Sequence, residues 1–293
     1  MEAALSANAA QTADVSDPYV LIAPLRRSAP LLFASPHSGR RYPLAMLAAA
    51  KVSLASLRRG EDAYVDELFA GAAAHGAPVL CASFGRAYVD LNRDPNELDR
   101  EMFASALPAH IGAASPRVQA GLGAIPRVAG DGRDIYRAKL PIEEAAQRIE
   151  AIHRPYHAML STLMDDALSL FDCAILIDCH SMPSSARGAL APDIVLGDRY
   201  GASCHPTIIS MAEASLISMG YRVARNTPFA GGYSTQTHGR PGARRHALQI
   251  EINRGLYLDE RGFTRTQGFR RVQADMSRLA EALVAAELHT SLS

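Results

Sequence analysis

The sequence lacks an excess of charge of either sign, cysteine pairs of the C-x-x-C type and apolar runs long enough to span a membrane. Lys plus Arg and Asp plus Glu each total 30 of its 293 residues. This balance argues against a nucleic acid or an acidic membrane surface as the main partner. The shortness of the apolar runs argues against a membrane span. The expected partner is therefore a small molecule.

Cysteine is scarce as well, and three of the four cysteines lie in or beside apolar runs; the four are Cys81, Cys173, Cys179 and Cys204. This usage is typical of buried free thiols in a reducing compartment and argues against a disulfide framework. The first 16 residues are rich in Ala and Ser but lack the basic segment of a signal peptide. We therefore expect a cytoplasmic protein in which residues 1–18 form a loosely attached tail.

The composition that remains is that of an ordinary globular protein, with 48% hydrophobic and 20% charged residues. A chain of this length can bury a large core. Since neither an internal repeat nor a long linker divides it, we predict a single α/β domain over residues 19–293.

Two short apolar runs end in the same way, with a histidine just beyond the run. Residues 174–177 lead into Asp178 and His180, and residues 31–34 lead into the segment Ser-Pro-His37-Ser-Gly. Such runs are typical of strands buried on both faces. Side chains just past a parallel strand lie in the crevice at its carboxyl end, where open α/β sheets bind ligands. We therefore interpret His37 and His180 as two ligands of one metal.

The other expected elements follow from periodicity and turn residues. Further strands are predicted at residues 19–22, 79–83, 87–91, 193–197, 221–224 and 247–252, with 79–83 and 87–91 paired as a hairpin. Helices are predicted at residues 61–75, 141–170, 206–219 and 264–288, with Pro155 kinking or splitting the second. Residues 99–126 and the glycine-rich stretch 226–242 are expected to be mostly loop.

A carboxylate ligand is expected from the start of the helix at 61–75, where Glu61 and Asp62 are adjacent. Both lie about equally far from the apolar face of that helix, so periodicity leaves the choice between them open. Either residue also has a simpler explanation, because a negative charge in the first turn of a helix is favourable in itself.

Two histidines and one carboxylate with an open fourth position are a common ligand set of hydrolytic zinc. Zinc lowers the pKa of water and polarises a carbonyl, and a further carboxylate is needed to move protons. Glu251 is the candidate for that base, although it can also be explained as a partner of Arg254 or Arg225. Asn92 and Arg93 follow a predicted strand and would bind a substrate carboxylate; a surface pair between Arg93 and Asp94 is the alternative.

Four other histidines receive simpler interpretations. His153, His157 and His246 are expected to be structural, and His238 lies in the glycine-rich loop, where it can contact substrate. Cys179 next to His180 suggests a thiol nucleophile, but neighbours on a strand point to opposite faces, which argues against that idea.

Several segments, in this order along the chain, resemble the N-formylglutamate amidohydrolase family from about residue 30 to 262. They are Ser35-Pro-His-Ser-Gly, Glu61-Asp-Ala-Tyr-Val-Asp-Glu-Leu, Phe84-Gly-Arg-Ala-Tyr-Val-Asp-Leu-Asn-Arg93, Asp178-Cys-His-Ser-Met, Phe229-Ala-Gly-Gly-Tyr and Gln249-Ile-Glu-Ile-Asn-Arg254. The resemblance implies a zinc-carboxypeptidase-like fold with a mixed sheet between helices. It also implies hydrolysis of N-formyl-L-glutamate to formate and L-glutamate in histidine breakdown.

The resemblance further implies a role for each matching position. The metal ligands would be His37, Asp62 and His180, which favours Asp62 over Glu61; the catalytic residues would be Glu251 and Arg86; the substrate-binding residues would be Asn92, Arg93, Gly232 and Tyr233. Zinc carboxypeptidases space their first ligands as H-x-x-E, whereas position 40 here is Arg. The carboxylate ligand must therefore come from farther along the chain.

Three alternatives remain open at this point. The first is a deacylase or carboxypeptidase-like hydrolase of another N-acyl amino acid or of a peptidoglycan fragment. The second is a non-catalytic protein that binds acyl amino acids. A divalent ion other than zinc can occupy the same ligands.

Overall fold

A seven-stranded mixed sheet forms the centre of the computed structural model, which describes residues 17–108, 111, 115–184 and 191–286. In spatial order its strands are β1 (Tyr19–Ile22), β3 (Val79–Ala82), β2 (Leu31–Ser35), β4 (Ala174–Met182), β7 (Arg245–Asn253), β5 (Ile194–Gly197) and β6 (Val223–Arg225). The predicted α/β architecture with a mixed sheet flanked by helices is confirmed.

Four neighbouring strands of the sheet, β3, β2, β4 and β7, run parallel to one another. At one edge β1 pairs antiparallel with β3, and at the other β5 pairs antiparallel with β7 and parallel with β6. Because β2, β4 and β7 end at the same side of the sheet, residues just past each of them are brought together.

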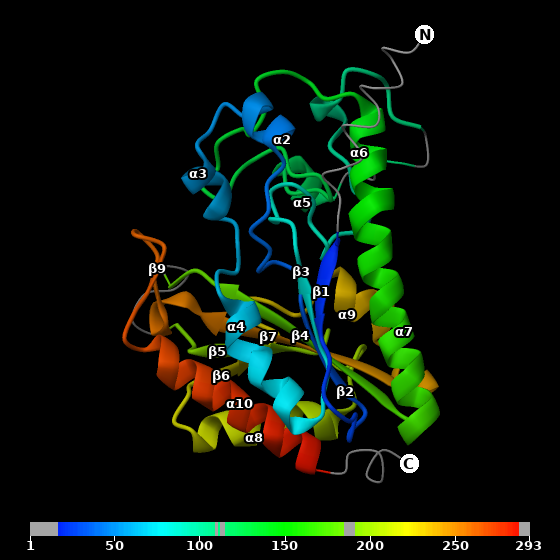
Figure 1. Ribbon diagram of the computed structural model, residues 1–293, viewed down its shortest axis with the longest axis vertical. Coiled ribbons are helices and arrows are strands. Elements are labelled where there is room, and N and C mark those ends of the chain that lie inside the picture. The colour runs from blue at the N-terminus through cyan, green and yellow to red at the C-terminus, as the bar shows by residue number, and fades with distance from the viewer. Residues whose placement is uncertain (1–16, 109–110, 112–114, 185–190, 287–293) are drawn as a thin grey trace.

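Side chains alternate between the two faces of each strand and form two separate cores. On β4, Ile175 and Ile177 belong to the first core, and Ala174 and Leu176 to the second. The first core lies beneath α4 (Val65–Phe69), η1 (Ala70–His75), α8 (Pro206–Ser218) and α10 (Phe269–Ala285). The second lies beneath α6 (Ile142–Arg148), η3 (Ile149–His153) and α7 (Arg154–Phe171). Figure 1 shows α4, α8 and α10 on one side of the sheet and α7 on the other.

Short elements connect these layers: α2 (Leu44–Ala49), α3 (Leu54–Arg58), η2 (Arg100–Met102), α5 (Pro116–Gln119), α9 (Tyr233–His238), η6 (Pro241–Ala243), η7 (Arg254–Leu256), β8 (Leu258–Asp259) and β9 (Thr264–Arg265). The described part of residues 99–126 is thus mostly irregular, as expected. The glycine-rich stretch at 226–242 contains the helix α9, which its turn residues concealed.

The helix predicted at residues 61–75 begins later than expected. Tyr64 adopts a left-handed conformation, with φ of 63°, and the α-helix starts only at Val65 before it tightens into the 3-10 helix η1. Asp62 therefore lies on an irregular segment before the helix and not in its first turn. An irregular backbone can direct two adjacent carboxylates to different places, which a regular helix start cannot.

The strand predicted at residues 87–91, and with it the hairpin, is wrong. Strand β3 pairs with β1 and β2, and residues 87–91 form turns, with Tyr88 N–H donating to the Gly85 carbonyl. Ala87, Val89 and Leu91 are nevertheless buried in the second core. Apolar and other residues therefore alternate in this loop as they would in a strand, because every second side chain packs into the core.

The long helix predicted at residues 141–170 is present without a break. A π-helical turn, η3, joins α6 to α7, and Pro155 occupies the second position of α7. Proline is tolerated there because the wider turn already changes the hydrogen-bonding pattern. The terminal helix ends at Ala285. Residues 1–16 of the tail predicted at 1–18, and the last residues of the predicted terminal helix, lie outside the described part of the chain.

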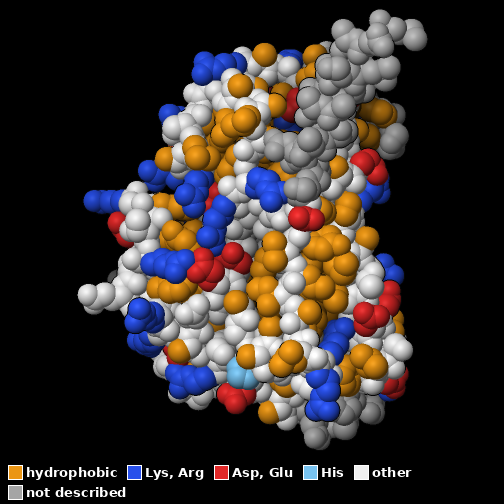
Figure 2. All heavy atoms as spheres, viewed as in Figure 1, with side chains coloured by type: hydrophobic (Ala, Val, Ile, Leu, Met, Phe, Trp, Pro, Cys, Tyr) orange, Lys and Arg blue, Asp and Glu red, His pale blue; other side chains and the backbone are white. Residues whose placement is uncertain are grey.

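The surface carries charges of both signs. Figure 2 shows Lys and Arg side chains interspersed with Asp and Glu on the face viewed. This distribution agrees with a formal net charge of zero. None of the helices in the described residues has both the length and the hydropathy that a membrane span requires.

Candidate metal centre and substrate cavity

A cavity of about 350 Å³ opens at the carboxyl ends of β2, β4 and β7. Strand register explains its position. His180 on β4 pairs with Glu251 on β7, and both point to the same face, two positions beyond Asp178 and Gln249. His37 follows β2 by two residues. The cavity is lined by His37, Arg59, Asp62, Arg86, Asp90, Asn92, Arg93, Arg117, Leu122, His180, Gly232, Glu251 and Arg254, among others.

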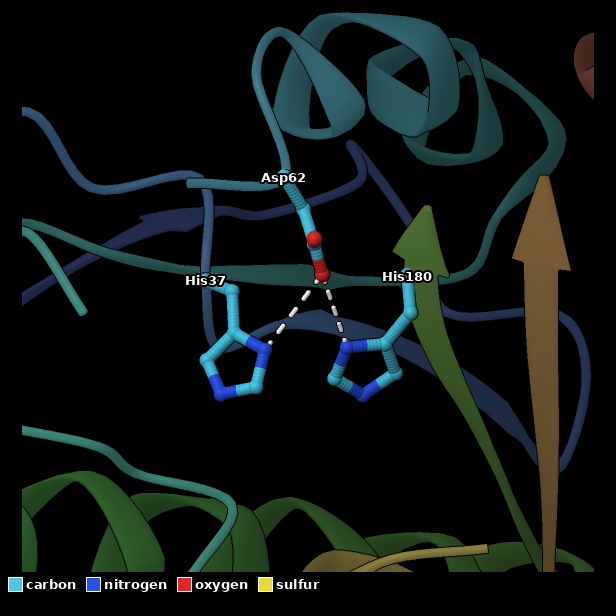
Figure 3. Close-up of side chains that lie close together, drawn as sticks. All are labelled: His37, Asp62 and His180. Atoms are coloured by element: carbon cyan, nitrogen blue, oxygen red, sulfur yellow. Dashed lines mark hydrogen bonds and ion pairs between the residues drawn. The ribbon is translucent and has the colours of Figure 1, made fainter. Parts of the chain in front are cut away.

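Three side chains that are far apart in sequence converge at the floor of this cavity. His37, Asp62 and His180 are all buried, and their ligand atoms lie within 4.8 Å of one another. In Figure 3 both imidazole rings point toward the Asp62 carboxylate. The Nδ1 atom of His180 lies 2.9 Å from Oδ2 of Asp62, and that of His37 lies 3.3 Å from the same oxygen.

A second carboxylate lies behind each imidazole. Nε2 of His37 is 2.7 Å from Oδ1 of Asp90, and Nε2 of His180 is 3.0 Å from Oδ2 of Asp178. A carboxylate can only accept, so Nε2 of each ring carries a proton and donates it outward. In the neutral rings this leaves the lone pair of each Nδ1 directed at Asp62. Metal-binding histidines are commonly oriented by carboxylates in this manner.

The ligand set fits a divalent metal. Nδ1 of His37 is buried without a hydrogen-bond partner, so a ring nitrogen with a lone pair faces an anionic oxygen across 3.3 Å. Two electron-rich atoms at that distance repel unless a cation lies between them. Zinc bonds of roughly 2.0–2.1 Å in a tetrahedron separate two ligand atoms by about 3.3 Å. His37, Asp62 and His180 could therefore hold such an ion.

Glu61 and Asp62 have different contacts, and those of Asp62 favour it as the ligand. Glu61 turns away and accepts hydrogen bonds from Tyr42 Oη at 2.9 Å and Arg58 Nε at 3.2 Å. Asp62 faces the histidines, and its backbone N–H donates to the His37 carbonyl at 2.9 Å. Its Oδ1 accepts a hydrogen bond from Arg254 at 2.9 Å. Arg254 thus pairs with Asp62, and Glu251 keeps its carboxylate free of that arginine.

Burial opposes ionisation of Asp62, but the hydrogen bond from His180 and the proximity of both imidazoles outweigh it and hold the pKa of Asp62 well below its usual value. Burial also opposes the charged form of His180 and lowers its pKa. The charge of Asp178 and the hydrogen bonds to Asp178 and Asp62 outweigh burial and raise this pKa well above the usual value. Without an ion the His180 imidazole therefore retains a proton that these carboxylates stabilise. A divalent cation would supply the same positive charge.

Glu251 lies beside this centre on the neighbouring strand. Burial raises the pKa of its carboxyl to about 7, with the nearby charge of Asp62 contributing in the same direction. Gln249 donates a hydrogen bond to its Oε1 at 2.9 Å. A carboxylate with such a pKa exchanges protons readily near neutrality, as a general base must.

Arg86 and Arg93 also line the cavity, but their surroundings differ. Nε of Arg86 donates to Oδ2 of Asp90 at 2.8 Å, which connects it to the partner of His37. Arg93 donates through Nε to the Leu122 carbonyl and through one terminal nitrogen to the Asn92 carbonyl. Its other terminal nitrogen makes no hydrogen bond to a described residue. Arg93 can therefore present that nitrogen to a substrate.

The side chain of Asn92 already has partners within the protein. Its Oδ1 accepts from the Ser234 N–H at 2.8 Å, and its Nδ2 donates to Oδ2 of Asp178 at 3.4 Å. A Cβ atom at Gly232 would come within 2.6 Å of this amide, so only glycine permits the approach. A substrate contact by Asn92 would have to share or replace these bonds.

The two predicted substrate-binding residues of α9 have different positions. Gly232 lines the cavity, whereas the Tyr233 ring packs on His153 and His157, with centroid distances of 5.5 Å and 5.0 Å. Tyr233 is thus not among the described residues that form the cavity wall.

His153 and His157 hold the chain on either side of Asn92. Nε2 of His157 donates to the Leu91 carbonyl at 2.7 Å, and Nε2 of His153 donates to the Arg93 carbonyl at 2.9 Å. Nδ1 of His157 is then an acceptor and lies 3.0 Å from Nε2 of His238. Burial lowers the pKa of all three imidazoles, so they are neutral. His238 is buried in this cluster and is absent from the described cavity lining.

Two further sequence predictions concern residues outside the cavity. His246 packs near His205, with ring centroids 6.3 Å apart, which agrees with a structural role. Cys179 points into the first core, its thiol donates to the Ile177 carbonyl, and burial raises its pKa well above the usual value. The thiol therefore lies on the opposite face of β4 from His180.

Sequence reasoning missed three residues of the site: Asp90, Asp178 as a partner of His180, and Arg254 as a partner of Asp62. Asp178 had a usable signal, because it lies two residues before His180 and so shares its face of β4. Asp90 and Arg254 had none, since their partners are reached only through the tertiary fold.

The parallel strands of this sheet bring two imidazoles and several carboxylates to one cavity. The protein thus falls in the class of α/β enzymes whose ligand site lies at the carboxyl ends of the strands. Comparison with known proteins narrows the class. The family model for N-formylglutamate amidohydrolase matches residues 29–258. The chain belongs to this family.

Individual relatives agree with that assignment. The N-formylglutamate deformylase of Pseudomonas aeruginosa is 31% identical over 242 residues, which cover 80% of this chain and 84% of the relative. That of Pseudomonas putida is 30% identical over 265 residues, covering 87% and 92%. The crystal structure of N-formylglutamate amidohydrolase from Ralstonia eutropha JMP134 superposes with a TM-score of 0.88 at 34% identity, covering 94% of this chain and all of the other.

The histidine cluster generates a stability prediction. Replacing His157 by Leu leaves the Leu91 carbonyl and the His238 N–H without partners in a buried site, which should lower the free energy of unfolding by about 1–3 kcal/mol for each unpaired group. His157→Gln keeps a donor near the position of Nε2 and should lose clearly less. Urea unfolding followed by circular dichroism measures both. Equal losses in the two variants would contradict the proposed contribution of this hydrogen bond.

Proposed function

We propose that this chain hydrolyses N-formyl-L-glutamate to formate and L-glutamate with the help of one divalent cation, zinc being the first choice. One observation carries the proposal: two buried imidazoles direct Nδ1 at the shared oxygen of Asp62, in a chain that belongs to the N-formylglutamate amidohydrolase family. The catalytic domain would comprise residues 19–293. The reaction would serve histidine breakdown in the cytoplasm.

In this proposal His37, Asp62 and His180 hold the metal. When bound, the metal would lower the pKa of water and polarise the formyl carbonyl. Asp90 and Asp178 keep the Nε2 proton on each ring and so present Nδ1 to the ion. Arg254 neutralises the second oxygen of Asp62 and fixes the carboxylate in place.

Glu251 is proposed as the base that takes a proton from water and returns it to the departing amine. Its burial, its pKa of about 7 and its position next to His180 across the β4–β7 ladder support that role. Arg86 is proposed to lie near the carbonyl oxygen, because it lines the cavity and is held by Asp90.

Arg93 is proposed to bind the carboxylate next to the amide that is cleaved. It is 8% exposed, it lines the cavity, and one terminal nitrogen makes no hydrogen bond to a described residue. Arg forms paired hydrogen bonds with a carboxylate in the direction set by its planar head group. Asn92 and Gly232 are proposed to complete this wall, with Asn92 bonded to the start of α9, whereas Tyr233 packs on His153 and His157 outside the wall.

The function is tested by measuring the free amino group that hydrolysis releases from N-formyl-L-glutamate, N-acetyl-L-glutamate and a peptidoglycan peptide. We expect release from the formyl substrate alone at a useful rate, loss of activity on dialysis against a chelator, and recovery when about one zinc per chain is returned. A chelated protein that keeps full activity, or a metal-free protein that only binds the substrate, would contradict the proposal.

The carboxylate behind His37 generates a second test. Asp90→Asn keeps the shape of the side chain but removes the charge that orients the imidazole, so zinc affinity should fall by about 10- to 100-fold. Competition with a chromophoric chelator measures the affinity, and excess zinc should restore part of the activity. Asp165→Asn, which alters a carboxylate that is 62% exposed, serves as the control. Unchanged zinc affinity in Asp90→Asn would argue against the role of Asp90.

Glu251→Gln retains an oxygen that can accept from Gln249 but loses the base. Turnover should fall by about 10²- to 10⁴-fold while zinc stays bound. A base must be deprotonated, so kcat/KM of the wild type should decline as the pH falls below the pKa of Glu251, about 7 before a cation lowers it. The variant should lose this acid limb. Glu150→Gln, at an exposed position, serves as the control. Turnover in Glu251→Gln close to that of this control would exclude Glu251 as the base.

A further inference from the structure

The arginines of the cavity outnumber what its own carboxylates can neutralise. Five arginines line it, Arg59, Arg86, Arg93, Arg117 and Arg254, and the carboxylates that line it are Asp62, Asp90 and Glu251. Arg254 is committed to Asp62, and Arg86 to Asp90. Arg59 and Arg117 form no ion pair with a carboxylate of the described residues, and Arg93 only reaches Asp90 at 4.0 Å. Such a cavity favours a ligand with more than one negative charge.

Arg117 and Arg93 lie on the same wall of the cavity. Nε of Arg93 donates to the Leu122 carbonyl at 3.1 Å, and the Leu122 N–H donates to the Arg117 carbonyl at 2.8 Å. Leu122 itself lines the cavity between them. Burial lowers the pKa of Arg93 to about 10, and the positive charges of Arg86 and Arg117 contribute to the decrease. The two guanidinium groups are thus close enough to repel each other, and an anion between or upon them would relieve the repulsion.

The two arginines differ in depth. Arg93 is buried near the metal ligands, whereas Arg117 is exposed, on the single-turn helix α5 at the mouth of the cavity. A ligand held by its first carboxylate on Arg93 would extend outward past Leu122 toward Arg117. Arg59 lies elsewhere in the cavity than Arg93 and Arg117. Its carbonyl accepts a hydrogen bond from Arg254, the arginine that pairs with Asp62.

From this arrangement we infer that Arg117 is a specificity-determining residue that binds the second, distal carboxylate of a dicarboxylic acyl amino acid. The inference rests on the proposed function and adds to it the reason why an acidic side chain is preferred. Arg93 receives the carboxylate beside the cleaved amide, and Arg117 receives the carboxylate of the side chain. A neutral side chain of equal size would leave Arg117 without a partner.

The test compares N-formyl-L-glutamate with its neutral isostere N-formyl-L-glutamine in the wild type and in Arg117→Met. The wild type should prefer the glutamate substrate by at least about tenfold in kcat/KM. Arg117→Met should lower kcat/KM for that substrate by about 10- to 100-fold, mainly through KM, and leave the glutamine substrate within about threefold. Arg270→Met removes an exposed positive charge from α10 and should change neither value.

Three kinetic outcomes would overturn the inference. Arg117→Met could lower kcat/KM for both substrates alike, which would mean that Arg117 serves the carboxylate that both share. It could lower neither. The preference could instead disappear in Arg59→Met and persist in Arg117→Met, which would assign the distal carboxylate to the opposite wall.

Equilibrium binding separates this inference from the proposed function. Calorimetry with glutarate and with butyrate needs no turnover. The zinc-loaded wild type should bind glutarate more tightly than butyrate, and Arg117→Met should lose this difference in affinity. If the chain bound glutarate in this way but released no formate, the proposed function would fail and the dicarboxylate site would stand. If it released formate from both substrates equally, the proposed function would stand and the inference would fail.

Discussion

The site depends on one buried carboxylate, that of Asp62, which is shared by two imidazoles and an arginine. Asp62 has a single oxygen facing two imidazoles and a second oxygen bonded to Arg254. A charge buried this deeply is tolerated only when it is paired and fully hydrogen-bonded. The surrounding residues satisfy that condition, and the irregular segment before α4 brings the carboxylate to the ends of two strands.

The sheet explains how so many polar groups can be buried together. Along β4 and β7 the face that carries Ala174, Leu176 and Ala247 in the second core continues as Asp178, His180 and Glu251 at the carboxyl ends. The same alternation that builds the core therefore builds the site, one or two residue pairs farther along. A shift of either strand by one residue would turn its polar groups into the first core.

Much of this arrangement could be predicted from the sequence. The strands before His37 and His180 were identified because β-branched and apolar runs end abruptly in turn residues, and the family resemblance was confirmed. The choice between Glu61 and Asp62 could not be made from periodicity, because the segment that carries them is not helical. Residues 87–91 imitated a strand because a loop anchored through Ala87, Val89 and Leu91 alternates in the same way. The roles of Asp90 and Arg254 depend on partners that are distant in sequence, which no local pattern reports.

The separation of the two cores has a practical consequence for protein engineering. Helices α8 and α10 cover the face of the sheet opposite to the cavity, and none of their buried residues is among those that line it. Residues such as Leu216 and Leu279 can be repacked for thermal tolerance while the walls around the substrate keep their shape. Directed evolution of this enzyme can thus treat robustness and selectivity as two libraries, one on each side of the sheet.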